Sequence, residues 1–131
     1  MKNSSGIKIL WNVWDRESTV SWVFNNIKIL KPYKLPPVSV SVLPLNAMVG
    51  VVGSFDEFGS SNFQVFSFTG DLINTYTAPD IGTGCSFGSV REIDLNKVDI
   101  SFGYYLNGVW QDQSGTLDLE SSSIEKIHRN Y

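Results

Sequence analysis

The fold of this chain is decided by residues 38–54, VSVSVLPLNAMVGVVGS. Valines alternate with serines over Val38–Val42, which is the pattern of a strand with one face buried and the other exposed. The following run Ala47–Ser54 is apolar enough to be a central strand of a sheet. Gly50 and Gly53 within this run predict a bulge or a close approach of another segment. These residues therefore indicate a core built from β-sheet.

Further strands are predicted on both sides of this stretch, separated by polar turns. They cover Ile7–Asp15, Thr19–Asn25, Ile27–Lys34, Phe63–Phe68, Leu72–Thr77, Ser89–Ile93, Val98–Tyr105 and Gly108–Gln111. Gly70 and the pair Asn107-Gly108 supply tight hairpin turns. The C-terminal segment has two interpretations. A capping box formed by Ser122 and Glu125 favours one short helix, whereas a hairpin from Thr116–Leu119 to Ile124–Ile127 favours a final strand.

The composition indicates an all-β or mainly β protein with one domain, residues 1–131. Residues that favour strands (Val, Ile, Phe, Thr, Tyr and Trp) number 46, against 32 for Ala, Leu, Glu, Lys, Met, Gln and Arg, which favour helices. A chain of 131 residues buries roughly two-thirds of its unfolded surface, enough for a single core. Successive strands joined by short turns predict an antiparallel meander of hairpins.

A repeat with a period of 43 residues is visible in the chain. Ile29-Leu30, Tyr33 and Pro36 align with Leu72-Ile73, Tyr76 and Pro79. Each copy resembles the outer two strands of a propeller blade, although successive hairpins of a twisted sheet or sandwich produce the same pattern. At about 40–50 residues per blade, the chain holds at most three units, fewer than a closed propeller requires. We therefore expect a monomer or a weak homodimer.

Charge is distributed unevenly along the chain. Residues 1–34 carry six Lys or Arg and two acidic residues, a net charge of +4, whereas residues 35–125 carry two basic and eleven acidic residues, a net charge of −9. Because an acidic body repels phosphates and attracts basic proteins, we expect a protein partner and no direct binding of nucleic acid. Apolar runs are far shorter than the ~18 residues that cross a bilayer, and residues 1–6 lack a signal-peptide core, so we expect a cytoplasmic protein without membrane contact.

Groups for catalysis and metal binding are sparse. The segment Gly84-Cys85-Ser86-Phe87-Gly88 fits the nucleophile-elbow pattern of hydrolases. That motif needs a strand–turn–helix unit, whereas a strand is predicted directly after it, and Cys85 is then a small buried apolar residue. One Cys and one His leave too few ligands for a zinc site. We therefore expect a protein that is not an enzyme and that needs no metal or cofactor.

The loop after the central strand is the first candidate for a partner-binding site. Phe55 and Phe58 bracket Asp56 and Glu57 in a stretch whose glycine and serines indicate an exposed loop. Aromatic side chains dominate the energetics of interfaces, and carboxylates beside them pair with arginines. The alternative is that both phenylalanines fold back into the core of the protein.

A second acidic set lies near the turns on either side of the glycine-rich segment, and it shares a surface with the first set if these turns are adjacent. Its members are Asp80, Glu92, Asp94 and Asp99. Trp110 follows the Asn-Gly turn and is the best tryptophan for an interface. Trp11, Trp14 and Trp22 lie on predicted paired strands, where we expect core positions.

The layout resembles small all-β immunity proteins of contact-dependent growth inhibition and related polymorphic toxin systems. The resemblance rests on the repeated Tyr-x-x-Pro hairpin ends, the Gly84–Gly88 strand entry, the Asn107-Gly108 turn and the closing segment Ile124–Tyr131. It implies a cytosolic protein that binds one cognate bacterial toxin domain, often a basic nuclease, and blocks its active site or substrate groove. The alternative is a non-catalytic carbohydrate-binding or structural β-module, in which Trp110 and Tyr104-Tyr105 stack on sugar.

Overall fold

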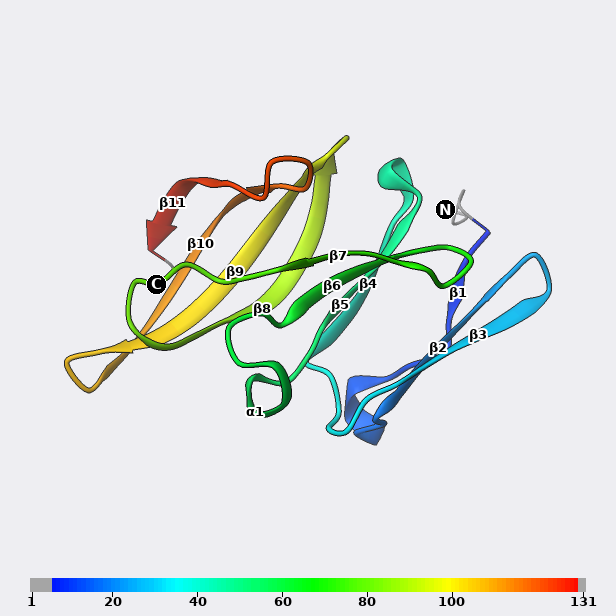
Figure 1. Cartoon of the computed structure of the whole chain (residues 1–131), viewed down its shortest axis with the longest axis horizontal. Helices are drawn as coiled ribbons and strands as arrows, with labels where there is room; N and C mark the ends of the chain where they lie inside the picture. The colour runs from blue at the N-terminus through cyan, green and yellow to red at the C-terminus, as the bar shows by residue number, and fades with distance from the viewer. Residues whose placement is uncertain (1–5, 130–131) are drawn as a thin grey trace.

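The computed structural model describes residues 6–129, except for the side chains of residues 126, 128 and 129. Within this range the chain forms three antiparallel sheets, which stack in chain order (Figure 1). The first sheet contains β1 (Lys8–Ile9), β2 (Thr19–Phe24) and β3 (Ile27–Pro32). The second contains β4 (Ser39–Leu43), β5 (Met48–Val52), β6 (Phe63–Ser67) and β7 (Leu72–Tyr76). The third contains β8 (Thr83–Asp94), β9 (Lys97–Leu106), β10 (Val109–Asp118) and β11 (Ile124–Arg129).

Within each sheet the strands pair in chain order, so each sheet is an antiparallel meander. Helical structure within residues 6–129 is limited to two 3₁₀ turns, Val13–Asp15 and Pro44–Asn46, and the single helical turn α1 (Phe55–Phe58). The mainly β fold expected from the composition is therefore confirmed, in the form of a three-layer sandwich (Figure 1).

The second sheet is the middle layer, and it is covered on both faces. Val49 and Val51 of β5 pack with Trp22 in the core between the first and second sheets. Val52 belongs to the larger core between the second and third sheets. This two-sided burial explains why residues 47–54 are apolar without alternation. Gly50 permits the close approach expected there, because a Cβ at this position would lie 2.9 Å from the Phe63 ring.

Two tyrosines give the 43-residue repeat a structural meaning. Tyr33 follows the last strand of the first sheet, and its hydroxyl donates to Gln64 Oε1 of the second sheet at 2.9 Å. Tyr76 ends the last strand of the second sheet, and its hydroxyl donates to the Leu119 carbonyl beside the third sheet at 2.6 Å. Each tyrosine therefore ties the end of one sheet to the following sheet.

The free edge of β8 is covered by side chains of the second sheet. Ser39 and Ser41 of β4 donate from their hydroxyls to the carbonyls of Gly88 and Val90, each at 3.2 Å. These bonds occupy carbonyls that would otherwise form an open edge for pairing with another chain. The segment Gly84–Gly88 is a continuous part of this strand, which is not the strand–turn–helix unit of a nucleophile elbow.

The N-terminal strand expected over Ile7–Asp15 is wrong for most of its length. Only Lys8–Ile9 pairs with β2, and the chain then enters the first 3₁₀ turn. The Asn12 side chain accepts the Trp14 N–H at 2.8 Å, and Arg16 takes a left-handed conformation, so a local cap replaces the ladder. As a result Trp14 is 87% exposed rather than in the core, whereas Trp22 is fully buried as expected.

The C-terminal segment forms a strand, β11, and not a helix. Asp118 stabilises the preceding turn, because its Oδ1 accepts the N–H groups of Glu120 and Ser121 at 2.9 and 3.0 Å. These hydrogen bonds lower the pKa of the Asp118 carboxyl. Ser122, the residue expected to cap a helix, has a left-handed φ of 65° in this turn. The side chain of His128 lies outside the described residues.

Candidate partner-binding surface

In the loop Phe55–Phe58, one phenylalanine is exposed and the other folds back into the protein, so each of the two alternatives predicted from the sequence applies to one residue. Phe58 packs inward: its ring centroid lies 5.7 Å from that of Tyr33, and it fills the space beside Gly53. Phe55 is 42% exposed, and its ring tip lies 3.8 Å from where a Cβ of Gly84 would be. Phe55 therefore remains available at the surface next to the start of β8, whereas Phe58 holds the loop in place.

Two of the candidate carboxylates hold loops within the chain. Glu57 accepts the N–H groups of Lys34 and Leu35 at 3.0 and 2.9 Å. Glu92 accepts the N–H groups of Leu45 and Asn46 at 3.0 and 3.1 Å, and also the Asn46 side-chain amide at 2.8 Å. Sequence reasoning missed this role, because the partners lie 22 to 47 residues away. The carboxylate oxygens of Glu57 and Glu92 therefore accept hydrogen bonds within the protein and are less free to bind a partner.

The second acidic set does not form one surface. Asp80 precedes the start of β8, whereas Glu92 and Asp94 lie at its other end (Figure 1). The two ends of β8 pair with Tyr105 and Lys97 of β9, eight positions apart, which at about 3.3 Å per residue separates these ends by roughly 25 Å. Asp99, in the adjacent part of β9, is paired with Arg91. Of this set, Asp80 alone lies at the same end of the molecule as Phe55.

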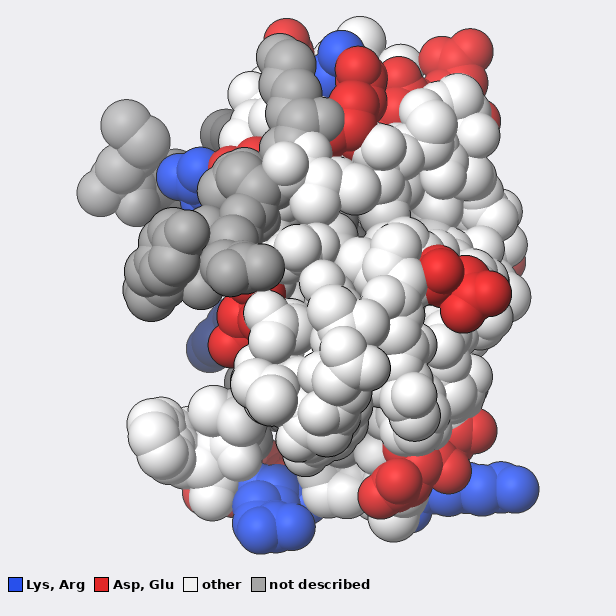
Figure 2. All heavy atoms as spheres, turned by 90° about the vertical axis from the view of Figure 1, so that its left-hand side faces the viewer, with Lys and Arg blue, Asp and Glu red and all other residues white. Residues whose placement is uncertain are grey.

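Exposed apolar side chains gather at that end, which we call the hairpin surface. Its members are Phe55, Ile81, Tyr105, Leu106, Val109 and Trp110, each between 38% and 59% exposed. The β9–β10 hairpin pairs Leu106 with Val109 and Tyr105 with Trp110, and these two pairs project from opposite faces of the hairpin tip. Thr83 of β8 pairs with Tyr105, which brings the β7–β8 loop alongside. Figure 2, which faces this side of the molecule, shows a broad uncharged area with most charged side chains around its borders.

Trp110 is the largest aromatic side chain of the hairpin surface. Its ring occupies the space above Gly103, where a Cβ would lie 2.0 Å from the indole Cζ2. The Tyr105 ring meets it edge to face, with the centroids 5.0 Å apart. Tyr104, one residue earlier, points into the core and is 5% exposed, so of the expected sugar-stacking pair only Tyr105 is on the surface.

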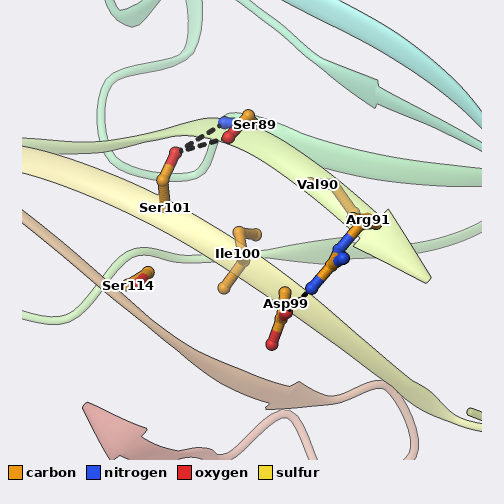
Figure 3. Close-up of a pocket in the computed structure, with 7 residues that line it drawn as sticks. All are labelled: Ser89, Val90, Arg91, Asp99, Ile100, Ser101 and Ser114. Atoms are coloured by element: carbon orange, nitrogen blue, oxygen red, sulfur yellow. Dashed lines mark hydrogen bonds and ion pairs between the residues drawn. The ribbon is translucent and has the colours of Figure 1, made fainter. Parts of the chain in front are cut away.

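A shallow pocket lies further along the outer face of the third sheet (Figure 3). Its volume is about 370 Å³. Ser89, Ser101 and Ser114 line it from three successive strands, and the Arg91–Asp99 pair lies beside them. The Ser101 hydroxyl accepts the Ser89 N–H at 2.9 Å. The outer face of this sheet is thus hydroxyl-rich next to the aromatic pair.

Cys85 lies near the hairpin surface but is buried. Burial, reinforced by the nearby Asp80 carboxylate, raises the pKa of its thiol to about 11. The thiol is therefore protonated at neutral pH and lacks the thiolate character of a nucleophile.

Asp112 is a candidate that the sequence reasoning overlooked. It follows Trp110 by two residues on β10, so both side chains project from the same face of the sheet. The alternation Trp110-Gln111-Asp112 after the Asn-Gly turn was the available signal. Together with Asp56 and Asp80, Asp112 gives the hairpin surface an exposed acidic rim.

Comparison of the chain with family models, with curated proteins and with solved structures gave no significant match. Among the described residues, no three His, Cys, Asp or Glu side chains are grouped as a metal site would require. In that same part of the chain, no helix has the length and apolar character needed to span a membrane.

Proposed function

We propose that this chain is a non-catalytic cytoplasmic immunity protein, which binds a cognate bacterial toxin domain and covers its active site or substrate groove. The observation that carries the proposal is the hairpin surface, where six large apolar side chains are exposed on the two faces of the β9–β10 hairpin tip and on the neighbouring loops. Exposed apolar patches of this kind are typical of protein interfaces. The partial resemblance to small all-β immunity proteins supports the same role.

The chemistry of the hairpin surface fits a basic partner. Trp and Tyr are enriched among the residues that contribute most to binding energy, and Trp110 and Tyr105 form a packed aromatic pair here. Asp112 lies on the same sheet face as Trp110, and Asp56 and Asp80 are exposed in α1 and in the β7–β8 loop. An acidic rim accelerates encounter with a cationic groove, such as that of a nuclease, and competes there with nucleic acid.

Co-purification with the C-terminal domain of the large protein encoded immediately upstream tests the proposal. We expect a tight complex, and we expect co-expression to restore growth of cells that produce that domain. Trp110→Ala should weaken the complex by about 2 kcal/mol or more, roughly 30-fold. Leu45→Ala is the matched control, because Leu45 is 62% exposed at the opposite end of the sandwich. Absence of both complex and protection would reject the immunity function.

A carbohydrate-binding module is the second candidate, and one observation favours it. The exposed Trp110 ring lies on the same sheet face as the serine-lined pocket, and indole faces and hydroxyl groups are common in binding sites for sugars. A glycan-binding assay with the wild type and Trp110→Ala separates the two candidates. A sugar-dependent signal that disappears in the variant would favour the module, and no signal would remove it.

A further inference from the structure

We infer that Trp110, Tyr105 and Asp112 form a receptor for one arginine side chain of the partner. This inference rests on the proposed function, which names a toxin domain as the protein that carries the arginine. The sequence predicts Trp110 as an interface residue but not what it binds. The third sheet places Tyr105, Gly103 and Asp112 around it.

The first step concerns the aromatic pair. Gly103 lies on β9 directly opposite Asp112, and its missing side chain leaves the space that the Trp110 ring fills. The Tyr105 ring packs edge to face against the Trp110 ring at an interplanar angle of 69°, which helps to fix the orientation of the indole. Tyr105 and Trp110 are each about half exposed. A positioned ring with open surface is what a cation–π contact requires.

The second step concerns the carboxylate. Asp112 projects from the same sheet face as Trp110, is exposed, and has no hydrogen-bond or ion-pair partner among the described residues. Asp99 on the same face differs, because Arg91 already neutralises it. Within the part of the chain that the structure describes, Asp112 is therefore a carboxylate without a counter-charge, two positions along β10 from the half-exposed Trp110.

The third step concerns the ligand. A guanidinium group is planar, stacks on aromatic rings and donates two parallel hydrogen bonds to a carboxylate. The receptor offers both partners side by side. The chain itself contains a related contact, in which Lys31 Nζ lies 5.0 Å from the centroid of the Phe66 ring. A neutral ligand would use the ring but would gain much less from Asp112, so an arginine fits best.

The probe for this receptor is a short acetylated, amidated Gly-Arg-Gly peptide, with the citrulline peptide as its neutral counterpart. The readout is the indole N–H signal of Trp110 in a two-dimensional NMR spectrum, assigned by its absence in Trp110→Phe. We expect the arginine peptide to shift this signal, and the citrulline peptide to bind at least about fivefold more weakly, which corresponds to about 1 kcal/mol. Equal binding of both peptides, or no shift, would overturn the inference.

Variants locate the effect. Asp112→Asn should weaken binding of the arginine peptide at least about fivefold. Asp71→Asn should leave it unchanged, because Asp71 is an exposed carboxylate at the β6–β7 turn of another sheet. A neutral oligosaccharide that shifts the Trp110 signal at lower concentration than the arginine peptide would overturn the inference in favour of a sugar site.

Titration of the toxin domain separates this inference from the proposed function. We expect Asp112→Asn to lower the affinity and to reduce its dependence on salt. A complex that is indifferent to Asp112→Asn would overturn the receptor while leaving the immunity function intact. Peptide binding without any toxin complex would support the receptor for an arginine ligand and reject the immunity function.

Discussion

Replacing Asn62 should cost more stability than replacing any exposed residue of the protein. Its side chain is 1% exposed and lies between the second and third sheets. The amide nitrogen donates to the carbonyls of Gly53 and Phe87, and its oxygen accepts the Phe87 N–H, all at 2.9 Å. Because both backbone groups of a strand residue point to the same side, the side chain takes the place of a neighbouring strand for Phe87.

The magnitude follows from these contacts. Asn62→Ala leaves three buried backbone groups without partners, at about 1–3 kcal/mol each, and some relief comes from water that enters. We expect the free energy of unfolding to fall by about 3–5 kcal/mol. A domain of this size has about 5–15 kcal/mol in total, so the loss is a large fraction.

Urea unfolding followed by circular dichroism measures the loss. At an m-value of about 2 kcal/mol/M, the midpoint should fall by roughly 1.5–2.5 M. Asn12→Ala is the control, because the exposed Asn12 side chain accepts a single N–H, that of Trp14, and we expect a loss of about 1 kcal/mol. Equal small losses in both variants would refute the reasoning that Asn62 substitutes for a strand.

Asn62→Asp adds a check with a definite sign. The new carboxyl keeps an oxygen that accepts the Phe87 N–H, but it is buried without a cation, so its pKa is raised in the folded state. A raised carboxyl pKa removes stability as pH rises through the range between the unfolded and folded pKa values. We therefore expect this variant to be closer to the wild type at acid pH than at neutral pH. The opposite trend would contradict the burial of the side chain.

Three further outcomes are expected. Tyr76→Phe should lower the free energy of unfolding by about 1–2 kcal/mol in urea titrations, because it leaves the buried Leu119 carbonyl unpaired. Cys85 should react with Ellman's reagent at pH 8 far more slowly in the folded than in the urea-unfolded protein, and rapid labelling of the folded protein would contradict its burial. The stability linked to its raised pKa should be lost as pH rises from 9 toward 11. Asp118→Asn should lower the melting temperature at neutral pH but not at a pH below the folded pKa, because the stability linked to a lowered carboxyl pKa is complete above the unfolded pKa and is lost as pH falls through the folded pKa.

The sequence by itself determined the mainly β fold and most of its strands. Alternation over Val38–Val42 and the unbroken apolar run after it reflect local side-chain direction, which has a period of two in any strand. The hairpins around Gly70 and Asn107-Gly108 follow from turn residues that tolerate positive φ. The repeated tyrosines were also visible as a pattern, although their hydrogen bonds to the next sheet were not.

Only the tertiary structure decided which side chains are exposed and which are engaged within the protein. A local cap at Asn12 turned Trp14 outward, and a missing side chain at Gly103 gave Trp110 its place beside Asp112. The sequence predicts that Glu57 and Glu92 bind a partner, whereas in the fold their carboxylates accept N–H groups of loops that are distant in sequence. The physical reason is the same in each case. Exposure and hydrogen-bond partners depend on segments brought together by sheet stacking, whereas strand formation depends on neighbours in sequence.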